Sequence, residues 1–500
     1  MHQSNLLPII SLFAYLGICS PTPSSSSNLE VKTDSGVLHG FINQVAPHVQ
    51  QFLGVPFAQP PIGSRRWLPP SRFRSNSSFN ASDIGPACPQ IPIADQGNSS
   101  VYAPLGGNQT EYFPPSMGPF SEDCLTLNVW APSNSKKNLP VIVFYFGGGF
   151  VQGGTNALYF NPQSWVERTQ SHIVVTPNFR SNIFGFPNAA GLDEQNLGLL
   201  DQRVSLEWIR DNIANFGGDP SRIVVWGQSA SAIALDFLNF AYPMDPIASG
   251  MILDSSTALF PSRGSQTPDT AHSNFTAVAA ALGCKDPSSQ IDCLRNSSWQ
   301  DIEAVLQADS SLKFVTVVDE NIVFSNYTQR YELGALSSIP AIIGSNEHEF
   351  NEGIPYPLGP LLNQTGSDEI TNSTFLCTAA LTSRLRASES RLTYRFRYDG
   401  NFSNISPSAY PGAYHASELP LFFGTADLHA PSTAYENKVS RALQDLWLDF
   451  ATDPKGGLAK AGWGSYGDGK AVLLGGADVP VREIELSQLE GVCGSVTIKT

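Results

Sequence analysis

One stretch decides the fold: Ile223-Val224-Val225-Trp226-Gly227-Gln228-Ser229-Ala230-Ser231, followed by Ala232-Ile233-Ala234-Leu235. A β-branched run reaches a glycine, turns at a serine and passes at once into an alanine-rich stretch. The order predicts a strand that turns sharply into a helix, with the Ser229 hydroxyl raised above the end of a sheet. The pattern G-x-S-x-G normally ends in glycine, whereas position 231 is a serine.

The composition is that of a globular, core-forming chain. Of 500 residues, 41% are hydrophobic and 15% are charged, and the formal net charge is −15. Such an acidic chain argues against nucleic acid or an anionic membrane as a partner. No linker-like break divides the sequence, so we expect one domain over residues 20–500.

The N-terminus has the character of a secretory signal peptide. Met1 to Cys19 contains no acidic or basic side chain, and Leu6 to Ile18 is a mostly apolar run too short to cross a bilayer. We expect residues 1–19 to be a signal peptide cleaved after Cys19. No other apolar stretch is long enough to span a membrane, so the sequence predicts no transmembrane segment.

Cysteines and glycosylation motifs also indicate an exported protein. Removing Cys19 leaves an even set that could pair completely in an oxidising compartment. These cysteines are Cys88, Cys124, Cys284, Cys293, Cys377 and Cys493. The density of N-x-S/T motifs predicts glycosylation. The candidate asparagines are Asn76, Asn80, Asn98, Asn108, Asn274, Asn296, Asn326, Asn363, Asn372, Asn401 and Asn404.

Strands alternate with helices along the chain, which predicts an α/β protein with a mainly parallel sheet. The continuous apolar run Pro140 to Tyr145 is typical of a strand buried on both faces. The other predicted strands are 31–41, 50–57, 172–176, 222–226, 251–253 and 340–343, and the predicted helices are 199–216 and 433–450. Residues 89–123 are rich in Pro, Gly, Asn and Ser and predict a long loop, of the kind that forms lids or rims.

A glycine run follows the strand that ends at Tyr145. In Phe146-Gly147-Gly148-Gly149-Phe150 the backbone can approach a bound carbonyl closely and direct N–H groups at it. Together with the N–H of Ala230, those of Gly147 and Gly148 would stabilise a developing oxyanion.

A serine nucleophile needs a histidine base, and the histidine needs a carboxylate to fix its tautomer. The histidines downstream of Ser229 are His272, His348, His415 and His429. Carboxylates follow the predicted strand 340–343, where a site at the end of a parallel sheet is built. Composition alone leaves the choice open among Glu347, Glu349 and Glu352.

Three further motifs carry a resemblance to a known family. They are Phe52-Leu53-Gly54-Val55-Pro56-Phe57-Ala58, the run from Ser121 to Trp130, and the run from Asn212 to Pro220. With the serine motif they resemble the type-B carboxylesterases of the cholinesterase/lipase superfamily, specifically its secreted fungal-type members. The resemblance covers about residues 30 to 465. It implies an α/β-hydrolase fold, with a central mostly parallel sheet flanked by helices and a disulfide-bounded lid loop.

The resemblance also implies the site. Ser229 aligns with the nucleophile and His415 with the base. The family string G-x-N-x-x-E-G aligns on Gly344, Asn346 and Glu349, which selects Glu349 as the acid. Gly147, Gly148 and Ala230 align with the oxyanion donors. The family disulfides imply Cys88–Cys124 and Cys284–Cys293, which leaves Cys377–Cys493 as the third pair.

Three positions depart from the family pattern. Phe146 replaces a histidine, so a polar contact that holds the glycine loop is expected to be lost. Gln228 replaces a glutamate and removes a charge, and Ser231 replaces a glycine where helix and strand pack closely. None removes a catalytic group, but we expect them to affect the rate and the pH profile.

The predicted function is a secreted serine esterase that works through an acyl-enzyme and needs no cofactor or metal ion. The loop 88–124 holds Tyr102, Tyr112, Phe113 and Phe120 but no tryptophan, which disfavours choline esters. Its two N-x-S/T motifs and few aliphatic side chains favour an esterase for soluble or small apolar esters over a lipase or sterol esterase. A non-catalytic binding protein on the same fold and a serine peptidase are the rival interpretations.

Overall fold

The computed structural model describes residues 29–91, 118–134, 136–260, 269–353, 363–406 and 412–495. The expected signal peptide 1–19 lies outside the described residues. So does the middle of the 88–124 loop, with Asn98, Asn108, Tyr102, Tyr112 and Phe113.

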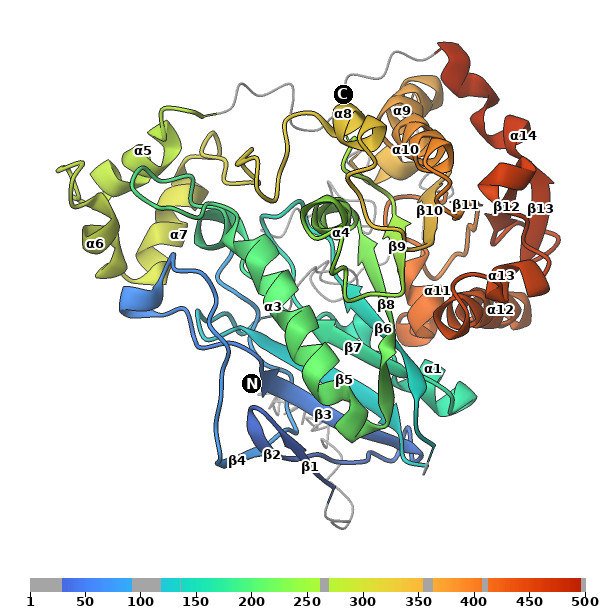
Figure 1. Cartoon of the computed structure of the whole chain (residues 1–500), viewed down its shortest axis with the longest axis horizontal. Helices are drawn as coiled ribbons and strands as arrows, with labels where there is room; N and C mark the ends of the chain where they lie inside the picture. The colour runs from blue at the N-terminus through green and yellow to red at the C-terminus, as the bar shows by residue number, and fades with distance from the viewer. Residues whose placement is uncertain are drawn as a thin grey trace, which may run out of the picture.

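A mixed sheet forms the centre of the described chain (Figure 1). Its order is β13-β12-β11-β10-β9-β8-β6-β7-β5-β3, and the seven strands from β12 to β7 run parallel. Antiparallel pairs occur only towards the two edges, so the predicted mostly parallel sheet is confirmed. The strands are β3 (Val49–Pro56), β5 (Thr126–Pro132), β6 (Leu139–Tyr145), β7 (Ile173–Pro177), β8 (Gly218–Gln228), β9 (Gly250–Asp254), β10 (Ala341–Asn346), β11 (Thr393–Tyr398), β12 (Lys470–Leu474) and β13 (Val481–Glu485). A second, three-stranded sheet holds β1 (Glu30–Thr33), β2 (Gly36–His39) and β4 (Ser78–Asn80).

Helices cover both faces of the large sheet because its central strands are apolar throughout. All seven residues of β6 are buried. The ring of Phe144 lies 4.9 Å from that of Phe423 on one face. The hydroxyl of the next residue, Tyr145, donates to the Gln202 carbonyl on the other face, at 3.1 Å. Side chains alternate along a strand, so each face is packed against its own helical layer.

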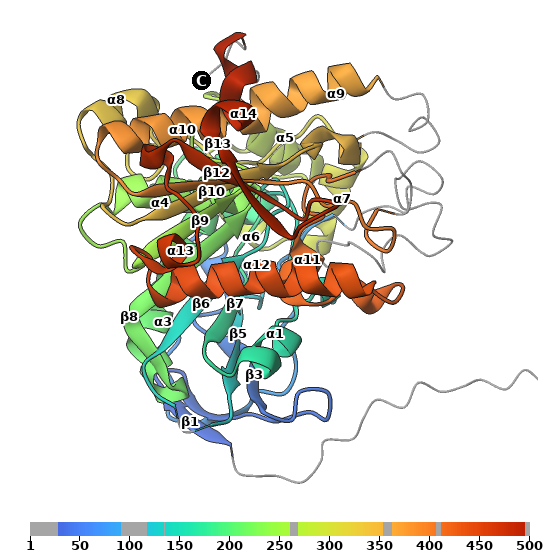
Figure 2. The same cartoon turned by 90° about the vertical axis from the view of Figure 1, so that its right-hand side faces the viewer.

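Two helical layers and a lateral group surround the sheet. One layer contains α3 (Leu197–Asn212) and α4 (Ala230–Ala241), which lie in front of the sheet in Figure 1. The other contains α1 (Gln163–Thr169), α11 (Leu419–Phe423) and α12 (Ala434–Thr452), seen in Figure 2. A smaller cluster around Trp67 gathers α2 (Asn182–Gly185), α5 (Ser273–Ala281), α6 (Gln290–Arg295) and α7 (Trp299–Ala308). The remaining helices are α8 (Tyr327–Glu332), α9 (Gln364–Thr371), α10 (Cys377–Ser388), α13 (Gly457–Lys460) and α14 (Leu486–Glu490).

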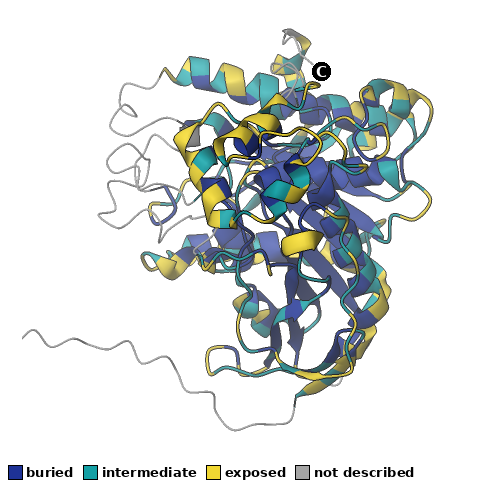
Figure 3. Ribbon diagram, turned by 90° about the vertical axis from the view of Figure 1, so that its left-hand side faces the viewer, coloured by how far each residue is buried: buried dark blue, intermediate teal, exposed yellow. Residues whose placement is uncertain are grey.

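The core beneath the serine motif is aromatic. The Trp226 ring lies 4.6 Å from Phe144, stacks on Phe423 at 5.4 Å and meets Trp447 of α12 edge-on at 6.1 Å. Figure 3 shows the strands of the central sheet as a buried layer between more exposed helices. Aromatic burial of this extent contributes several kcal/mol for each ring and fixes the end of β8 where the turn begins.

The three disulfides are those expected. Cys88 bonds to Cys124, Cys284 to Cys293 and Cys377 to Cys493. The Cys88–Cys124 bond joins the two described ends of the predicted lid loop. Among the described residues, no helix is both long enough and apolar enough to cross a membrane.

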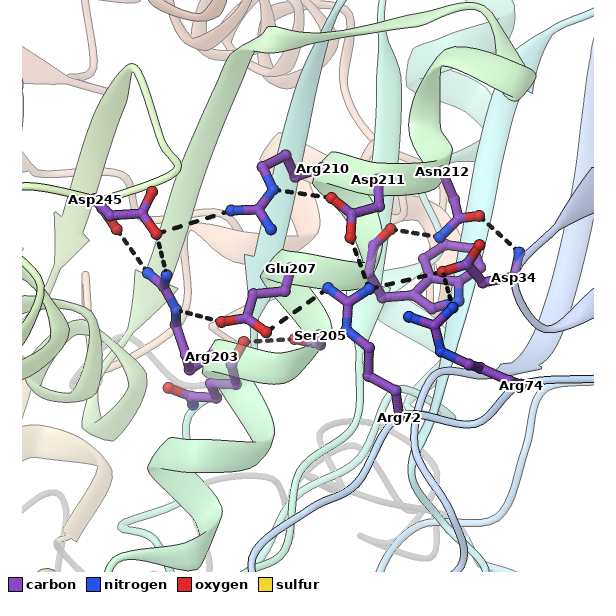
Figure 4. Close-up of polar contacts among 12 residues, drawn as sticks. Asp34, Arg72, Arg74, Arg203, Ser205, Glu207, Arg210, Asp211, Asn212 and Asp245 are labelled. Carbon is purple, nitrogen blue, oxygen red and sulfur yellow. Dashed lines mark hydrogen bonds and ion pairs between the residues drawn. The ribbon is translucent and has the colours of Figure 1, made fainter.

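A network of ion pairs joins α3 to the loops beside it (Figure 4). The Arg72 guanidinium lies 2.6 Å from Asp211, and 3.7 Å from both Asp34 and Glu207. Arg203 extends the network to Asp245. One arginine thus connects the turn between β1 and β2 with two turns of α3.

We expect Arg72→Gln to lower the free energy of unfolding by about 1 kcal/mol at low salt. A partly buried network of ion pairs contributes at the upper end of the range of free energies found for surface ion pairs. Arg74→Gln should have little effect, since Arg74 is 68% exposed and, within the described residues, pairs only with Asp34, at 3.7 Å. Urea denaturation with intact disulfides measures both. The Arg72 effect should shrink in 0.5 M NaCl, and an unchanged effect would show that charge is not its origin.

Candidate active site

Ser229 occupies the turn between β8 and α4. Its backbone has φ 57° and ψ −123°, a conformation that residues other than glycine rarely adopt. The Ser229 N–H donates to the Asp254 carbonyl at the end of β9, at 2.8 Å. The predicted strand-to-helix turn is therefore present, and the neighbouring strand holds its strained residue in place.

The glycine loop after β6 lies directly against this turn. A Cβ on Gly147 would be 2.9 Å from the Ser229 Cβ, so only a glycine can approach the serine this closely. Gly148 has φ +114°, which also favours glycine. Within the described residues the N–H groups of Gly147 and Gly148 have no acceptor. Ala230 is the first residue of α4, where an N–H has no partner within the helix.

Glu349 and His415 are brought together from distant parts of the sequence. Glu349 follows β10, and His415 lies in the segment that leads into α11. The His415 Nδ1–H donates to the Glu349 Oε2 at 2.5 Å. Glu349 is fully buried, whereas the imidazole is 16% exposed. The Asn346 N–H donates to the other carboxylate oxygen at 2.8 Å, which orients Glu349 towards the imidazole.

Gln228 connects the imidazole to the serine turn. Its Nε2 lies 3.2 Å from the Nε2 of His415. Because Nδ1 donates to Glu349, the imidazole Nε2 is an acceptor and the Gln228 amide is the donor. The residue before Ser229 therefore touches the ring nitrogen that a base would use.

The other downstream histidines have different partners. His348 Nδ1 lies 2.9 Å from Asp368 of α9. His272 Nδ1 lies 3.1 Å from the carbonyl oxygen of Asn188. Of the three glutamates, Glu347 pairs with Arg397 at 3.3 Å and Glu349 bonds to His415, while the side chain of Glu352 lies outside the described part of the chain.

Two further buried carboxyls lie behind the Glu349–His415 pair. Burial raises the pKa of Asp254 to about 8, and Glu349 adds to the shift. Burial likewise raises the pKa of Glu418 well above its usual range, with a smaller contribution from Asp254. Asp254 is therefore mostly protonated at neutral pH, and burial favours the neutral form of Glu418 as well.

Sequence reasoning missed Asp254 and Glu418. Glu418 contacts the Asn346 amide, and the Asp254 Oδ2 accepts from the Trp226 indole N–H at 3.2 Å. Their positions in the sequence were the signal that could have identified them. Asp254 ends a strand beside the serine motif, and Glu418 follows His415 by three residues, just before α11.

The base of the disulfide-bounded loop is hydrogen-bonded to Gly153, three residues after the glycine run 146–150. The Gln90 Nε2 donates to the Gly153 carbonyl, and the Gly153 N–H donates to the Gln90 Oε1, both at 2.8 Å. Asn182 donates to the Pro89 carbonyl at 3.3 Å. The loop that begins at Cys88 is thus anchored next to Gly147 and Gly148.

The crowding expected at position 231 occurs at Gly227 instead. A Cβ on Gly227 would lie 2.4 Å from the Ser231 carbonyl oxygen, so Gly227 is the residue that lets α4 approach β8. Ser231 is fully buried, and its hydroxyl donates to the Phe146 carbonyl at 2.6 Å. The extra side chain therefore fits.

The remaining features concern metal ions and the glycosylation motifs. Within the described part of the chain, no group of three or more His, Cys, Asp or Glu side chains is arranged to hold a metal ion.

Most of the described glycosylation motifs have an exposed asparagine. The exposed ones are Asn76, Asn80, Asn296, Asn326, Asn363 and Asn401, and the partly exposed ones are Asn274 and Asn372. Asn404 is buried, and its amide donates to the Ala426 carbonyl at 2.7 Å.

Comparison with known proteins agrees with this architecture. Residues 27–375 match the model of the carboxylesterase family. The chain is 42% identical to chlorogenic acid esterase of Aspergillus niger, over 88% of this chain and 86% of the relative. It is 37% identical to secreted lipase 5 of Gibberella zeae, over 93% and 92%. Identity to carboxylesterase 1D of Rattus norvegicus is 29%, over 96% and 94%.

The raised pKa of Asp254 predicts a pH-dependent cost to stability. Between about pH 4 and pH 8 the unfolded chain releases the Asp254 proton while the native state keeps it. The stabilising contribution of Asp254 to the free energy of unfolding is therefore greatest below pH 4 and is lost as the pH rises towards 8. We expect Asp254→Asn to gain thermal stability relative to wild type as the pH is raised from 5 to 8.

Melting temperatures at pH 5, 6, 7 and 8 measure this relative change. The variant keeps an acceptor for the Trp226 indole, so the slope with pH reports the charge. The control is Asp83→Asn, an exposed carboxyl, whose curve should follow that of wild type. A pH-independent difference between Asp254→Asn and wild type would contradict the assignment.

Proposed function

Because the chain belongs to the carboxylesterase family and is thus a carboxylic-ester hydrolase, we propose that it works through an acyl-enzyme formed on Ser229. The observation that carries this proposal is the hydrogen bond from His415 to the buried Glu349, beside the strained turn at Ser229. A bonded acid and base next to a partly exposed serine form the arrangement that acyl transfer requires.

In the first half of the reaction the Ser229 hydroxyl attacks the ester carbonyl. His415 Nε2 takes the serine proton, and Glu349 stabilises the imidazolium that results. Gly147, Gly148 and Ala230 direct their N–H groups at the developing oxyanion. His415 then gives the proton to the leaving alcohol, and the acyl group stays on Ser229.

In the second half a water molecule replaces the alcohol. His415 takes a proton from the water as it attacks the acyl-enzyme, and the same N–H groups stabilise the second oxyanion. Collapse of this intermediate returns the proton to Ser229 and releases the carboxylic acid. Each group acts twice, so one site performs both steps.

We propose soluble or small apolar esters as the substrate class. A pair of partly exposed aromatic side chains extends from the imidazole. The ring of Phe375 is 5.4 Å from His415, and that of Phe260 meets Phe375 edge-on at 5.1 Å. Phe375 belongs to a π-helical turn at 372–376, a distortion that is frequent at functional sites. Apolar walls of this kind suit a compact acyl or alkyl group.

A lipase activity is the second candidate. A relative that matches 93% of the chain is named a secreted lipase, whereas another is named chlorogenic acid esterase. We also propose that the protein is extracellular, in line with the secreted fungal relatives. Its glycans would be carried by exposed asparagines such as Asn76 and Asn401 rather than by the buried Asn404.

Ser229→Ala should lower kcat on p-nitrophenyl butyrate by roughly 10⁴-fold or more, because the acyl-enzyme cannot form. The matched control is Ser221→Ala, an exposed serine on the same strand, which should keep wild-type kcat. Equal activity in Ser229→Ala and wild type would exclude the nucleophile. A folded wild type that is inactive on every ester would favour the binding-protein alternative.

The substrate class is tested with p-nitrophenyl esters of increasing acyl length. We expect kcat/KM to be highest for short and medium chains, with no jump in rate above the solubility limit. Phe375→Ala should lower kcat/KM for the benzoate ester by roughly fivefold, through loss of about 1 kcal/mol of aromatic contact, and leave the acetate ester nearly unchanged. A jump in rate at the solubility limit would support the lipase instead.

A further inference from the structure

The Ser231 hydroxyl lies where the two halves of the proposed oxyanion hole meet. Ser231 is the second residue of α4 and follows Ala230, which is one donor. Phe146 precedes Gly147 and Gly148, which are the others. The 2.6 Å hydrogen bond from the Ser231 hydroxyl to the Phe146 carbonyl therefore joins the helix half to the loop half.

A third residue, Gln202, supports this hydrogen bond from the other side of the Ser231 hydroxyl. Gln202 of α3 is buried, and its Nε2 donates to the Ser231 Oγ at 3.3 Å. A hydroxyl has one proton, so with Gln202 as donor the Ser231 proton points to Phe146. Chained hydrogen bonds in a buried setting strengthen one another. The contact is thus oriented from both sides.

The Phe146 carbonyl lies beyond the paired residues of the sheet. β6 ends at Tyr145, which is its last residue to pair with β8, and the Ser229 N–H is directed at the Asp254 carbonyl of β9. Among the described residues, the Phe146 oxygen accepts a hydrogen bond from the Ser231 hydroxyl alone. A buried carbonyl without a partner would cost free energy, and the serine hydroxyl removes that cost.

The other side of Phe146 is held by packing. Its ring stacks on Phe179 at 4.5 Å with an interplanar angle of 13°. A Cβ on Gly153 would lie 2.4 Å from the ring, so the loop closes tightly over it. An aromatic contact and a hydrogen bond together leave the peptide before Gly147 little freedom.

We propose that Ser231 is a positioning residue of the oxyanion hole, which holds Gly147 and Gly148 at a fixed distance from the Ala230 N–H. This inference rests on the proposed function. Oxyanion donors act only when they lie within a few tenths of an ångström of the developing charge. The ester in the ground state needs these donors less than the transition state does. Loss of the hydroxyl should therefore lower kcat and leave KM nearly unchanged.

Ser231→Ala and Ser231→Gly remove the hydroxyl without adding volume. For both we expect kcat on p-nitrophenyl butyrate to fall roughly tenfold and KM to stay within twofold, a fraction of what deleting a donor costs. An alkyl trifluoromethyl ketone, which forms an oxyanion on the serine, should lose affinity by the same factor as kcat. Amide hydrogen exchange at 146–149 should become faster.

The matched control is Ser205→Ala in α3. Ser205 is also fully buried, its hydroxyl donates to the Gln202 carbonyl at 2.7 Å and lies 2.6 Å from the Tyr145 hydroxyl, and it makes no hydrogen bond to residues 146–149. It should lose stability as the Ser231 variants do, while kcat, inhibitor affinity and exchange at 146–149 stay at wild-type values. Equal losses in Ser205→Ala, or wild-type kcat and inhibitor affinity in Ser231→Ala, would overturn the proposal.

The exchange measurement separates this inference from the proposed function. If wild type hydrolyses no ester, the acyl-enzyme proposal fails, yet exchange at 146–149 still reports whether Ser231 holds the loop. If wild type is active but Ser231→Ala exchanges and reacts as wild type does, only the positioning role is lost.

Discussion

The backbone at Ser229 is the constraint on which the rest of the site depends. A non-glycine residue at φ 57° and ψ −123° stores strain of order 1–3 kcal/mol, which only a surrounding structure can offset. Here the offset comes from the hydrogen bond to the Asp254 carbonyl and from the aromatic packing of Trp226. Gly227 allows α4 to start against the strand. The hydroxyl is therefore positioned by a sheet and a helix, which are more rigid than a loop.

The same burial explains the electrostatics beneath the turn. Three carboxyls, Asp254, Glu349 and Glu418, share one dry region, and three negative charges there would repel one another strongly. The raised pKa values of Asp254 and Glu418 show how the repulsion is reduced, since burial favours the neutral form of both carboxyls. Gln228 is neutral and likewise adds no negative charge to this region. A carboxylate in its place would stabilise the imidazolium, so that a smaller fraction of His415 would be unprotonated and able to act as a base in acid.

The sequence predicted the elements whose pattern is local and strong. The apolar run of β6 and the strand-turn-helix order at Ser229 are visible in single windows, and they position half of the candidate site. The sequence did not predict β4, β5, β11, β12 or β13, and charged residues such as Arg395 and Glu483 interrupt the apolar pattern of β11 and β13. Asp254 escaped because most aspartates are solvated, and nothing in its neighbours shows that it is buried. Contacts between residues far apart in the sequence, such as Gln202 with Ser231, require the fold itself.

The three departures from the family pattern are best understood as one arrangement around the turn. Ser231 donates to the Phe146 carbonyl, and Gln228 touches both the imidazole and the glycine loop, where a Cβ on Gly147 would meet its Oε1 at 2.3 Å. Residues in contact do not contribute additively, so each departure has its effect only in the presence of its partner. The polar contact expected to be lost at Phe146 is supplied through its backbone by the residue that replaces the family glycine. Returning Ser231 to glycine while Phe146 remains would leave that carbonyl buried and without its donor.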